Sequence, residues 1–133
     1  MKFQADRADD VQIITGYGPG WLAINRQEQR GSHLVSSSGL LQPWDCPSFA
    51  ALSAAHFAAL AQVCADIERN TQRPVEVLLL GSGNQLRFVH PSWLRPLIQQ
   101  RVGMETMDTP AALRTYNVLA MEGRNVLAAL VLE

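Results

Sequence analysis

The chain has 133 residues, the usual size of one domain, and 47% of them are hydrophobic, which is enough for a substantial core. The formal net charge is −1, from 11 basic and 12 acidic residues, so the basic excess typical of a nucleic-acid-binding protein is missing. No run of about 18 apolar residues is present, which argues against direct insertion into a membrane. These features predict a single soluble domain over residues 1–133.

Residue types also bear on location and metal binding. The first ten residues carry three acidic side chains, which a mitochondrial transit peptide avoids, and no apolar signal core. The two cysteines, Cys46 and Cys64, are far apart, whereas a zinc site needs about four clustered ligands. No two of the three histidines have the i, i+4 spacing of a helix-borne metal pair. We therefore expect a cytoplasmic bacterial protein with no metal and no cofactor.

The N-terminal third is expected to be antiparallel β-structure. Four short segments have the apolar alternation or apolar content typical of strands: 11–17, 21–25, 32–36 and 40–44. Gly18-Pro19-Gly20 is typical of a turn. The polar residues 26–31 are expected to connect the second and third strands as a hairpin.

Helical spacing of apolar residues occurs in three segments: 54–69, 92–101 and 110–122. Cys64 lies within the apolar stripe of the first segment, so burial explains this cysteine. The second segment is expected to turn Leu94, Leu97 and Ile98 inward. Gly103 is expected to end it, because glycine readily adopts the left-handed conformation that follows many helices.

Two nearly unbroken apolar runs, Val75–Leu80 and Asn125–Leu132, are typical of strands that are covered on both faces. A shorter strand is expected at 104–107. Strands and helices alternate in this half, which implies right-handed crossovers and a partly parallel sheet. The predicted fold class is therefore α/β: a single three-layer domain with a central mixed sheet, an antiparallel β-rich N-terminal part and about three helices.

A glycine-rich turn, Gly81-Ser82-Gly83-Asn84, follows the first of these apolar runs. Ligands of open α/β sheets often bind beyond the carboxyl ends of such strands. The dinucleotide fingerprint is incomplete because Leu86 occupies its third glycine position, and neither a P-loop nor a nucleophile elbow is present. The turn is either a plain tight turn or a cradle for an anion or small ligand.

The run Asp108-Thr109-Pro110 is typical of a helix start, with the threonine as the N-cap residue and proline at the first helical position. The free amides and partial positive charge at such a start attract anions. This position therefore offers a second group of candidate binding residues.

Arg114 and Asn117 are three residues apart and share one face of this last helix. Glu105 and Asp108 could converge with Arg114 near the helix start. The result would be either a structural ion pair or a binding site, and both alternatives remain open. The candidate binding residues are Gly81, Ser82, Gly83, Glu105, Asp108, Thr109, Arg114 and Asn117. No catalytic residue is predicted.

Several runs together resemble the signature of one uncharacterised family of small bacterial, archaeal and mitochondrial domains: Leu79–Gly83, Met107–Thr109, Ala111–Ala112, Arg114–Leu119 and Glu122–Arg124. The mitochondrial member of that family is a respiratory complex I assembly factor. The resemblance implies a compact three-layer domain and a link to the assembly of membrane complexes. Many relatives have cysteine where this chain has Leu113, so it implies no thiol mechanism at that position here.

Two functions compete. The first is a non-catalytic assembly or adaptor protein that binds a protein partner, which could belong to a membrane complex; Trp21, Trp44 and Trp93 are then interface candidates, or else core residues. The second is a small-molecule or anion binder, or an enzyme, that uses the Gly81–Asn84 turn with Asp108 and Arg114. The sequence leaves the oligomeric state open.

Overall fold

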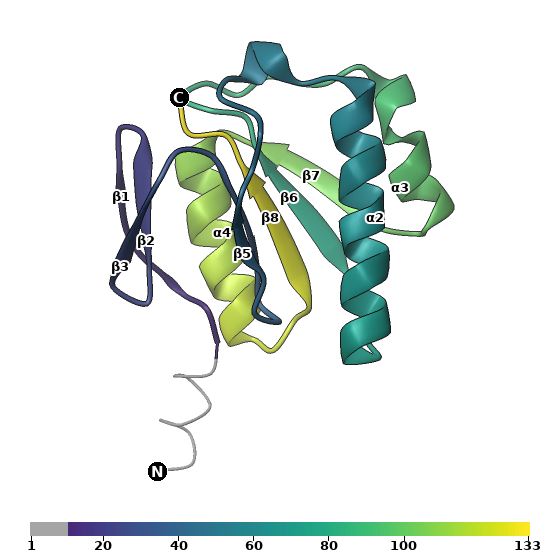
Figure 1. The fold of residues 1–133 in the computed structure, drawn as a ribbon, viewed down its shortest axis with the longest axis horizontal. Helices are drawn as coiled ribbons and strands as arrows, with labels where there is room; N and C mark the ends of the chain where they lie inside the picture. Colours follow the sequence, from purple (N-terminus) through teal and green to yellow (C-terminus); the bar gives the residue numbers. More distant parts are fainter. Residues whose placement is uncertain (1–10) are drawn as a thin grey trace.

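The computed structural model describes residues 11–133, and the first ten residues, on which the expected location partly rests, lie outside this range. A five-stranded sheet with the order β5-β4-β8-β6-β7 forms the centre (Figure 1). β8, β6 and β7 are parallel, whereas β4 is antiparallel to both β8 and β5. The strands are β4 (His33–Ser36), β5 (Leu41–Pro43), β6 (Val77–Gly81), β7 (Gly103–Met107) and β8 (Val126–Leu130). The predicted mixed sheet is confirmed.

Helices cover both faces of this sheet and complete the three layers. On one face lie α2 (Ala54–Thr71) and α3 (Arg95–Gln99), and on the other lies α4 (Thr109–Met121). Successive residues of β6 point to opposite faces, so Leu78 and Leu80 pack under α2 while Val77 and Leu79 pack under α4. β8 alternates in the same way. Both apolar runs are therefore buried central strands, as predicted.

A second, three-stranded antiparallel sheet lies beside α4 and consists of β1 (Ile14–Gly18), β2 (Trp21–Ile24) and β3 (Gln27–Arg30). The expected hairpin between the second and third predicted strands is wrong, because β2 pairs with β3 and the third predicted strand is β4 of the large sheet. Asn25 and Arg26, with φ values of 48° and 71°, form a tight turn that folds the polar residues 27–30 back along β2.

The middle of the chain also differs from the prediction. The helix expected at 92–101 is split into the 3-10 helix η2 (Pro91–Leu94) and α3. Within α3, Leu97 is buried but Ile98 is 67% exposed, because consecutive helical residues point about 100° apart and one turn buries one of them. Arg101, with φ of 62°, makes the left-handed turn expected of Gly103, and Gly103 begins β7.

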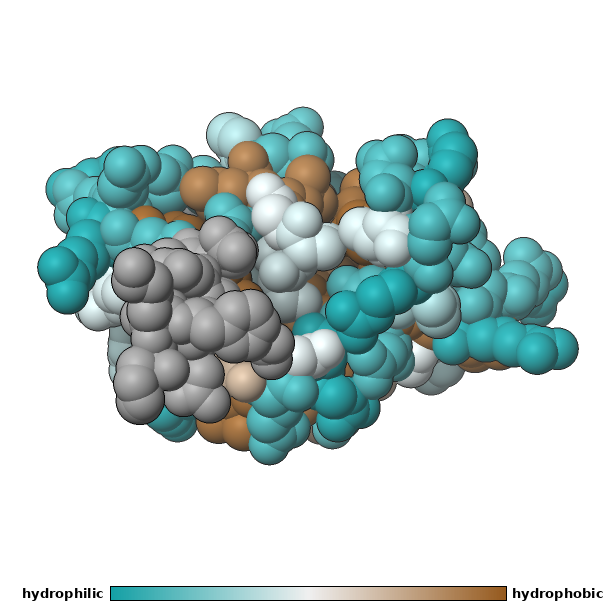
Figure 2. All heavy atoms as spheres, turned by 90° about the horizontal axis from the view of Figure 1, so that it is seen from below, coloured by the Kyte–Doolittle hydropathy of each residue, from teal (hydrophilic) through white to brown (hydrophobic). Residues whose placement is uncertain are grey.

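No helix among residues 11–133 is both long and apolar enough to cross a bilayer. Figure 2 shows the end of the molecule that lies at the bottom of Figure 1, where hydrophilic side chains interrupt the visible apolar areas. The opposite end, at the top of Figure 1, holds the carboxyl ends of β6, β7 and β8 together with the turn that follows β6.

Candidate functional site

The Gly81–Asn84 turn and the start of α4 lie side by side, as their positions after neighbouring parallel strands predict. The Ser82 amide donates to the Met107 carbonyl at 2.8 Å, and the Gly83 amide donates to Thr109 Oγ1 at 2.8 Å. The Thr109 hydroxyl in turn donates to the Val131 carbonyl at 2.7 Å. These contacts join the ends of β6, β7 and β8 through one buried threonine.

Gly81 is required by close packing at this point. A Cβ atom there would lie 2.9 Å from Thr109 Oγ1, closer than real Cβ atoms come, and 3.1 Å from Thr109 Cα, which is tighter than most real Cβ contacts. Gly83 is required by its backbone conformation, because its φ of +98° is rare for any other residue. Both glycines of the turn therefore serve the junction between the sheet and α4.

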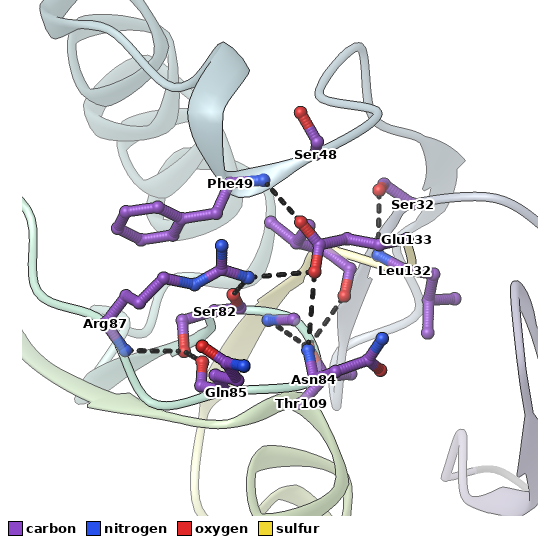
Figure 3. A network of polar contacts seen from close by, with 12 residues as sticks. Ser32, Ser48, Phe49, Ser82, Asn84, Gln85, Arg87, Thr109, Leu132 and Glu133 are labelled. Atoms are coloured by element: carbon purple, nitrogen blue, oxygen red, sulfur yellow. Dashed lines mark hydrogen bonds and ion pairs between the residues drawn. The ribbon is translucent and has the colours of Figure 1, made fainter.

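A carboxylate covers the outer side of the turn (Figure 3). Glu133 Oε2 accepts a hydrogen bond from the Phe49 amide at 3.1 Å, and Oε1 accepts one from Arg87 Nη2 at 2.8 Å. The Asn84 amide makes a longer contact of 3.5 Å with Oε1. The Phe49 amide, followed by Arg87 and the Asn84 amide, holds the pKa of Glu133 below its usual value. We refer to the Phe49 amide, the Asn84 amide and the Arg87 guanidinium as the carboxylate cradle.

Arg87 is held in place by more than the ion pair. Its Nη2 also donates to the Ser82 carbonyl at 3.0 Å, and its guanidinium lies over the Phe49 ring, 4.8 Å from the centroid. Its Nε is buried without an acceptor in the part of the chain that the structure describes. Sequence reasoning missed this cluster, because Arg87 and Glu133 are 46 residues apart and belong to no known motif.

The predicted convergence of Glu105, Asp108 and Arg114 is wrong. Asp108 is the N-cap residue of α4 and its carboxylate accepts from the Ala111 amide at 2.9 Å, so Thr109 is not the N-cap as expected. None of the ion pairs within residues 11–133 includes Arg114, which is exposed, as is Glu105. Asp108 precedes the helix and caps its first turn, whereas Arg114 lies in the second turn of α4.

Asn117 and its neighbour Tyr116 attach α4 to the N-terminal sheet. The Asn117 side chain donates to the Ile14 carbonyl and accepts from the Ile14 amide, both at 2.8 Å. The Tyr116 hydroxyl donates to the Gln12 carbonyl at 2.7 Å, and burial raises the pKa of this tyrosine. Asn117 thus makes a structural contact with the N-terminal sheet, away from the Gly81–Asn84 turn.

A shallow hollow of about 250 Å³ adjoins the carboxylate cradle. It lies between the β1–β2 turn and the ends of the central strands, and its lining includes Tyr17, Asn84, Thr109 and Glu133. This volume is below the roughly 300–1,000 Å³ of most small-molecule sites. Within residues 11–133 no three His, Cys, Asp or Glu side chains are grouped as a metal site would need.

The segment between β6 and η2 carries the most exposed apolar side chains near the cradle. Phe88 is 72% exposed and Leu86 is 52% exposed. By contrast, the three tryptophans named as interface candidates are all half-buried: Trp21, Trp44 and Trp93. Trp93 packs beside Phe57 of α2 at 6.1 Å between ring centroids, and Trp44 lies edge-on to His56 at 5.9 Å. The most exposed large apolar side chains at this end are therefore Phe88 and Leu86, followed by Tyr17 at 45%.

Comparison with other proteins places this fold among known relatives. An uncharacterised protein of Rhodobacter capsulatus is 35% identical over 118 residues, covering 89% of this chain and 82% of that protein. The NADH dehydrogenase [ubiquinone] 1 alpha subcomplex assembly factor 3 of Danio rerio is 29% identical over 119 residues, covering 90% of this chain. The Mus musculus protein of the same name is 39% identical over 57 residues, or 43% of this chain. These alignments span 63% and 31% of the two assembly factors, respectively.

Solved structures agree with the sequence relatives. A crystal structure of a protein from Bordetella parapertussis superposes with a TM-score of 0.78 at 32% identity, covering 92% of this chain and 97% of that one. A Mth938-like domain from Bordetella pertussis gives a TM-score of 0.74 at 30% identity, covering 92% of this chain and 87% of that one. The family described as "Protein of unknown function (DUF498/DUF598)" matches residues 14–131. This chain belongs to that family.

Proposed function

We propose that this protein is a non-catalytic assembly or adaptor protein that acts through protein–protein contacts, and that its partner can be a subunit of a membrane complex. The names of the Danio rerio and Mus musculus relatives support an assembly role. The main support from the structure is the segment 86–90, in which two large apolar side chains, Leu86 and Phe88, are exposed to solvent.

This segment has no regular secondary structure, and exposed side chains alternate along it with partly buried ones. Arg87 enters the cradle and Val89 packs against the core, while Leu86 and Phe88 point outward. The backbone is restrained near Ser82, whose hydroxyl donates to the Gln85 carbonyl at 2.6 Å and accepts from the Arg87 amide at 3.2 Å.

A restrained backbone favours binding by Phe88 and Leu86. Ordering a mobile loop on association costs free energy, and this segment is already ordered by its contacts. Large buried apolar and aromatic side chains commonly supply the centre of a protein interface. The exposed aromatic ring of Phe88 is therefore the expected anchor.

The alternative, a small-molecule binder or enzyme, has weaker support. At the Gly81–Asn84 turn, the groups that could donate to a ligand already have acceptors within the protein. The Ser82 amide donates to Met107, the Gly83 amide to Thr109 Oγ1, and the Thr109 hydroxyl to Val131. The neighbouring hollow is small for a metabolite. The two free, buried cysteines fit a reducing compartment, so we also propose a cytoplasmic location.

The adaptor role can be tested by affinity capture from the native cell, with the bound proteins identified by mass spectrometry. Leu86→Ser with Phe88→Ser should remove the specific partner. Val118→Ser is the matched control, because Val118 is also exposed, at 57%, but lies on α4 away from the segment. Equal capture by the wild type and the double variant would contradict the proposed surface.

A further inference from the structure

We propose that the carboxylate cradle is a binding site for a carboxylate, which this chain fills with its own Glu133 side chain until an acidic side chain of a partner replaces it. That the incoming carboxylate comes from a partner protein rests on the proposed function. The preference of the cradle for a carboxylate is independent of the proposed function, because the arrangement of the three donors determines this preference.

The donors suit a planar anion with two oxygens. The Phe49 amide addresses one oxygen of Glu133, while Arg87 and the Asn84 amide address the other. These donors come from two segments of the chain and converge on one carboxylate group (Figure 3). Gly83 leaves the space for it, because a Cβ there would collide with the Glu133 carboxylate and lie 2.8 Å from Arg87 Nη2.

Two of the three donors of the cradle, Arg87 and the Asn84 amide, are held by contacts that do not involve Glu133. The Ser82 carbonyl and the Phe49 ring hold the Arg87 guanidinium independently of the ion pair. Ser82 also holds the backbone on both sides of Asn84, through the Met107 carbonyl and the Gln85 carbonyl. When Glu133 leaves, the Arg87 guanidinium and the Asn84 amide therefore stay in place, and the Phe49 and Asn84 amides lose their carboxylate acceptor.

Glu133 is also placed to be exchanged. Its side chain is 23% exposed, and it lines the hollow between the β1–β2 turn and Asn84. An incoming side chain can approach through this hollow without disturbing the core. The exposed Leu86 and Phe88 flank Arg87 in the chain, so one partner segment could contact them and the cradle together.

The test is an NMR titration of the backbone amides of the wild type, Glu133→Ala and Asp66→Ala with acetate, N-acetylglutamate and inorganic phosphate. Asp66→Ala is the matched control, because it also frees an arginine, Arg69, from a 2.6 Å ion pair on α2. We expect Glu133→Ala to bind acetate and N-acetylglutamate at least tenfold more tightly than either other protein does. The largest shifts should occur at the Phe49 and Asn84 amides.

Three results would overturn the proposal. One is equal binding by Glu133→Ala and Asp66→Ala, which would mean that any freed arginine suffices. Another is tighter binding of phosphate than of either carboxylate, which would assign the cradle to a different anion. The third is no binding by Glu133→Ala or, if that variant does not fold, by Glu133→Gln. Anion binding by Glu133→Ala together with unchanged capture by the Leu86→Ser and Phe88→Ser variant would separate this inference from the adaptor proposal.

Discussion

Asn117 connects the last helix to the first strand through both backbone groups of Ile14. The sequence correctly placed it on α4, but its spacing from Arg114 suggested a shared binding face. Its actual partner lies 103 residues earlier in the chain, and helical spacing carries no information at that distance. Strand order did place the Gly81–Asn84 turn beside Thr109, because both follow neighbouring parallel strands. The Arg87–Glu133 pair was missed, because no local pattern connects residues so far apart in the chain.

Asn117→Ala should lower the free energy of unfolding by about 1–3 kcal/mol, because it leaves the Ile14 amide and carbonyl without their partner. Arg114→Ala should change it by less than about 0.5 kcal/mol, because Arg114 is exposed and forms no ion pair within residues 11–133. Urea denaturation of both variants measures the difference. Similar losses for the two would show that Arg114 has a structural role after all.

Glu133 should make stability depend on pH. Its pKa is lowered in the folded protein, chiefly by the Phe49 amide, so its contribution is present above the usual value of 4.5 and is lost as the pH falls through the lowered folded value. Glu133→Gln should therefore be less stable than the wild type by about 1–2 kcal/mol at pH 7, and the two should converge in acid. Thermal melts from pH 7 to pH 2 measure this, and a difference that stays constant with pH would refute it.

At the scale of elements, the apolar pattern identified the central strands β6 and β8, which are buried along their whole length, and the apolar stripe of α2. Burial on two faces, or along one stripe of a helix, leaves a strong signal in the sequence. The apolar pattern failed for β3, whose residues Gln27–Arg30 are all polar and mostly exposed. Strand formation there depends on the turn at Asn25 and Arg26, and arginine is not a typical turn residue. The pairing of β4 with β8 was also out of reach, since these strands lie at opposite ends of the chain.

Arg26→Gly should stabilise the protein by about 0.5–1 kcal/mol. At φ of 71° arginine has a steric cost that glycine lacks, and this outweighs the greater freedom of glycine in the unfolded chain. Arg30→Gly is the control, because Arg30 lies within β3, where glycine should destabilise by about 0.5–1 kcal/mol. Chemical denaturation that ranks the two variants in the reverse order would contradict the assigned turn.

At the scale of the molecule, the five-stranded sheet contributes side chains to two apolar clusters, one under α2 and one under α4. Leu79 faces α4, while the preceding residue, Leu78, faces α2. Trp44 and Trp93 pack against the same apolar cluster as Leu78. Neither helical layer can separate without exposing the buried face of the strands that it covers. We therefore propose that the chain unfolds as a single domain.

Leu79→Ala should lower the free energy of unfolding by about 2–5 kcal/mol, the usual cost of truncating a buried leucine. In a Trp21→Phe background, the midpoint should fall equally whether it is followed by far-ultraviolet circular dichroism or by the fluorescence of Trp44 and Trp93, which lie on the other face. Leu78→Ala, from that other face, should behave in the same way. A fluorescence midpoint that stays in place in Leu79→Ala would indicate two independent units.

The ribosome makes β8 after every strand that it joins. β4 and β6 lie on either side of β8 and do not pair with each other, so the large sheet cannot close before β8 leaves the exit tunnel. From Ser36 at the end of β4 to Leu130 at the end of β8 is 94 residues, or roughly 5–19 s at typical bacterial translation rates of about 5–20 residues per second. During that interval the apolar strands of the nascent chain have no completed core, so we expect chaperones that act at the ribosome to bind them.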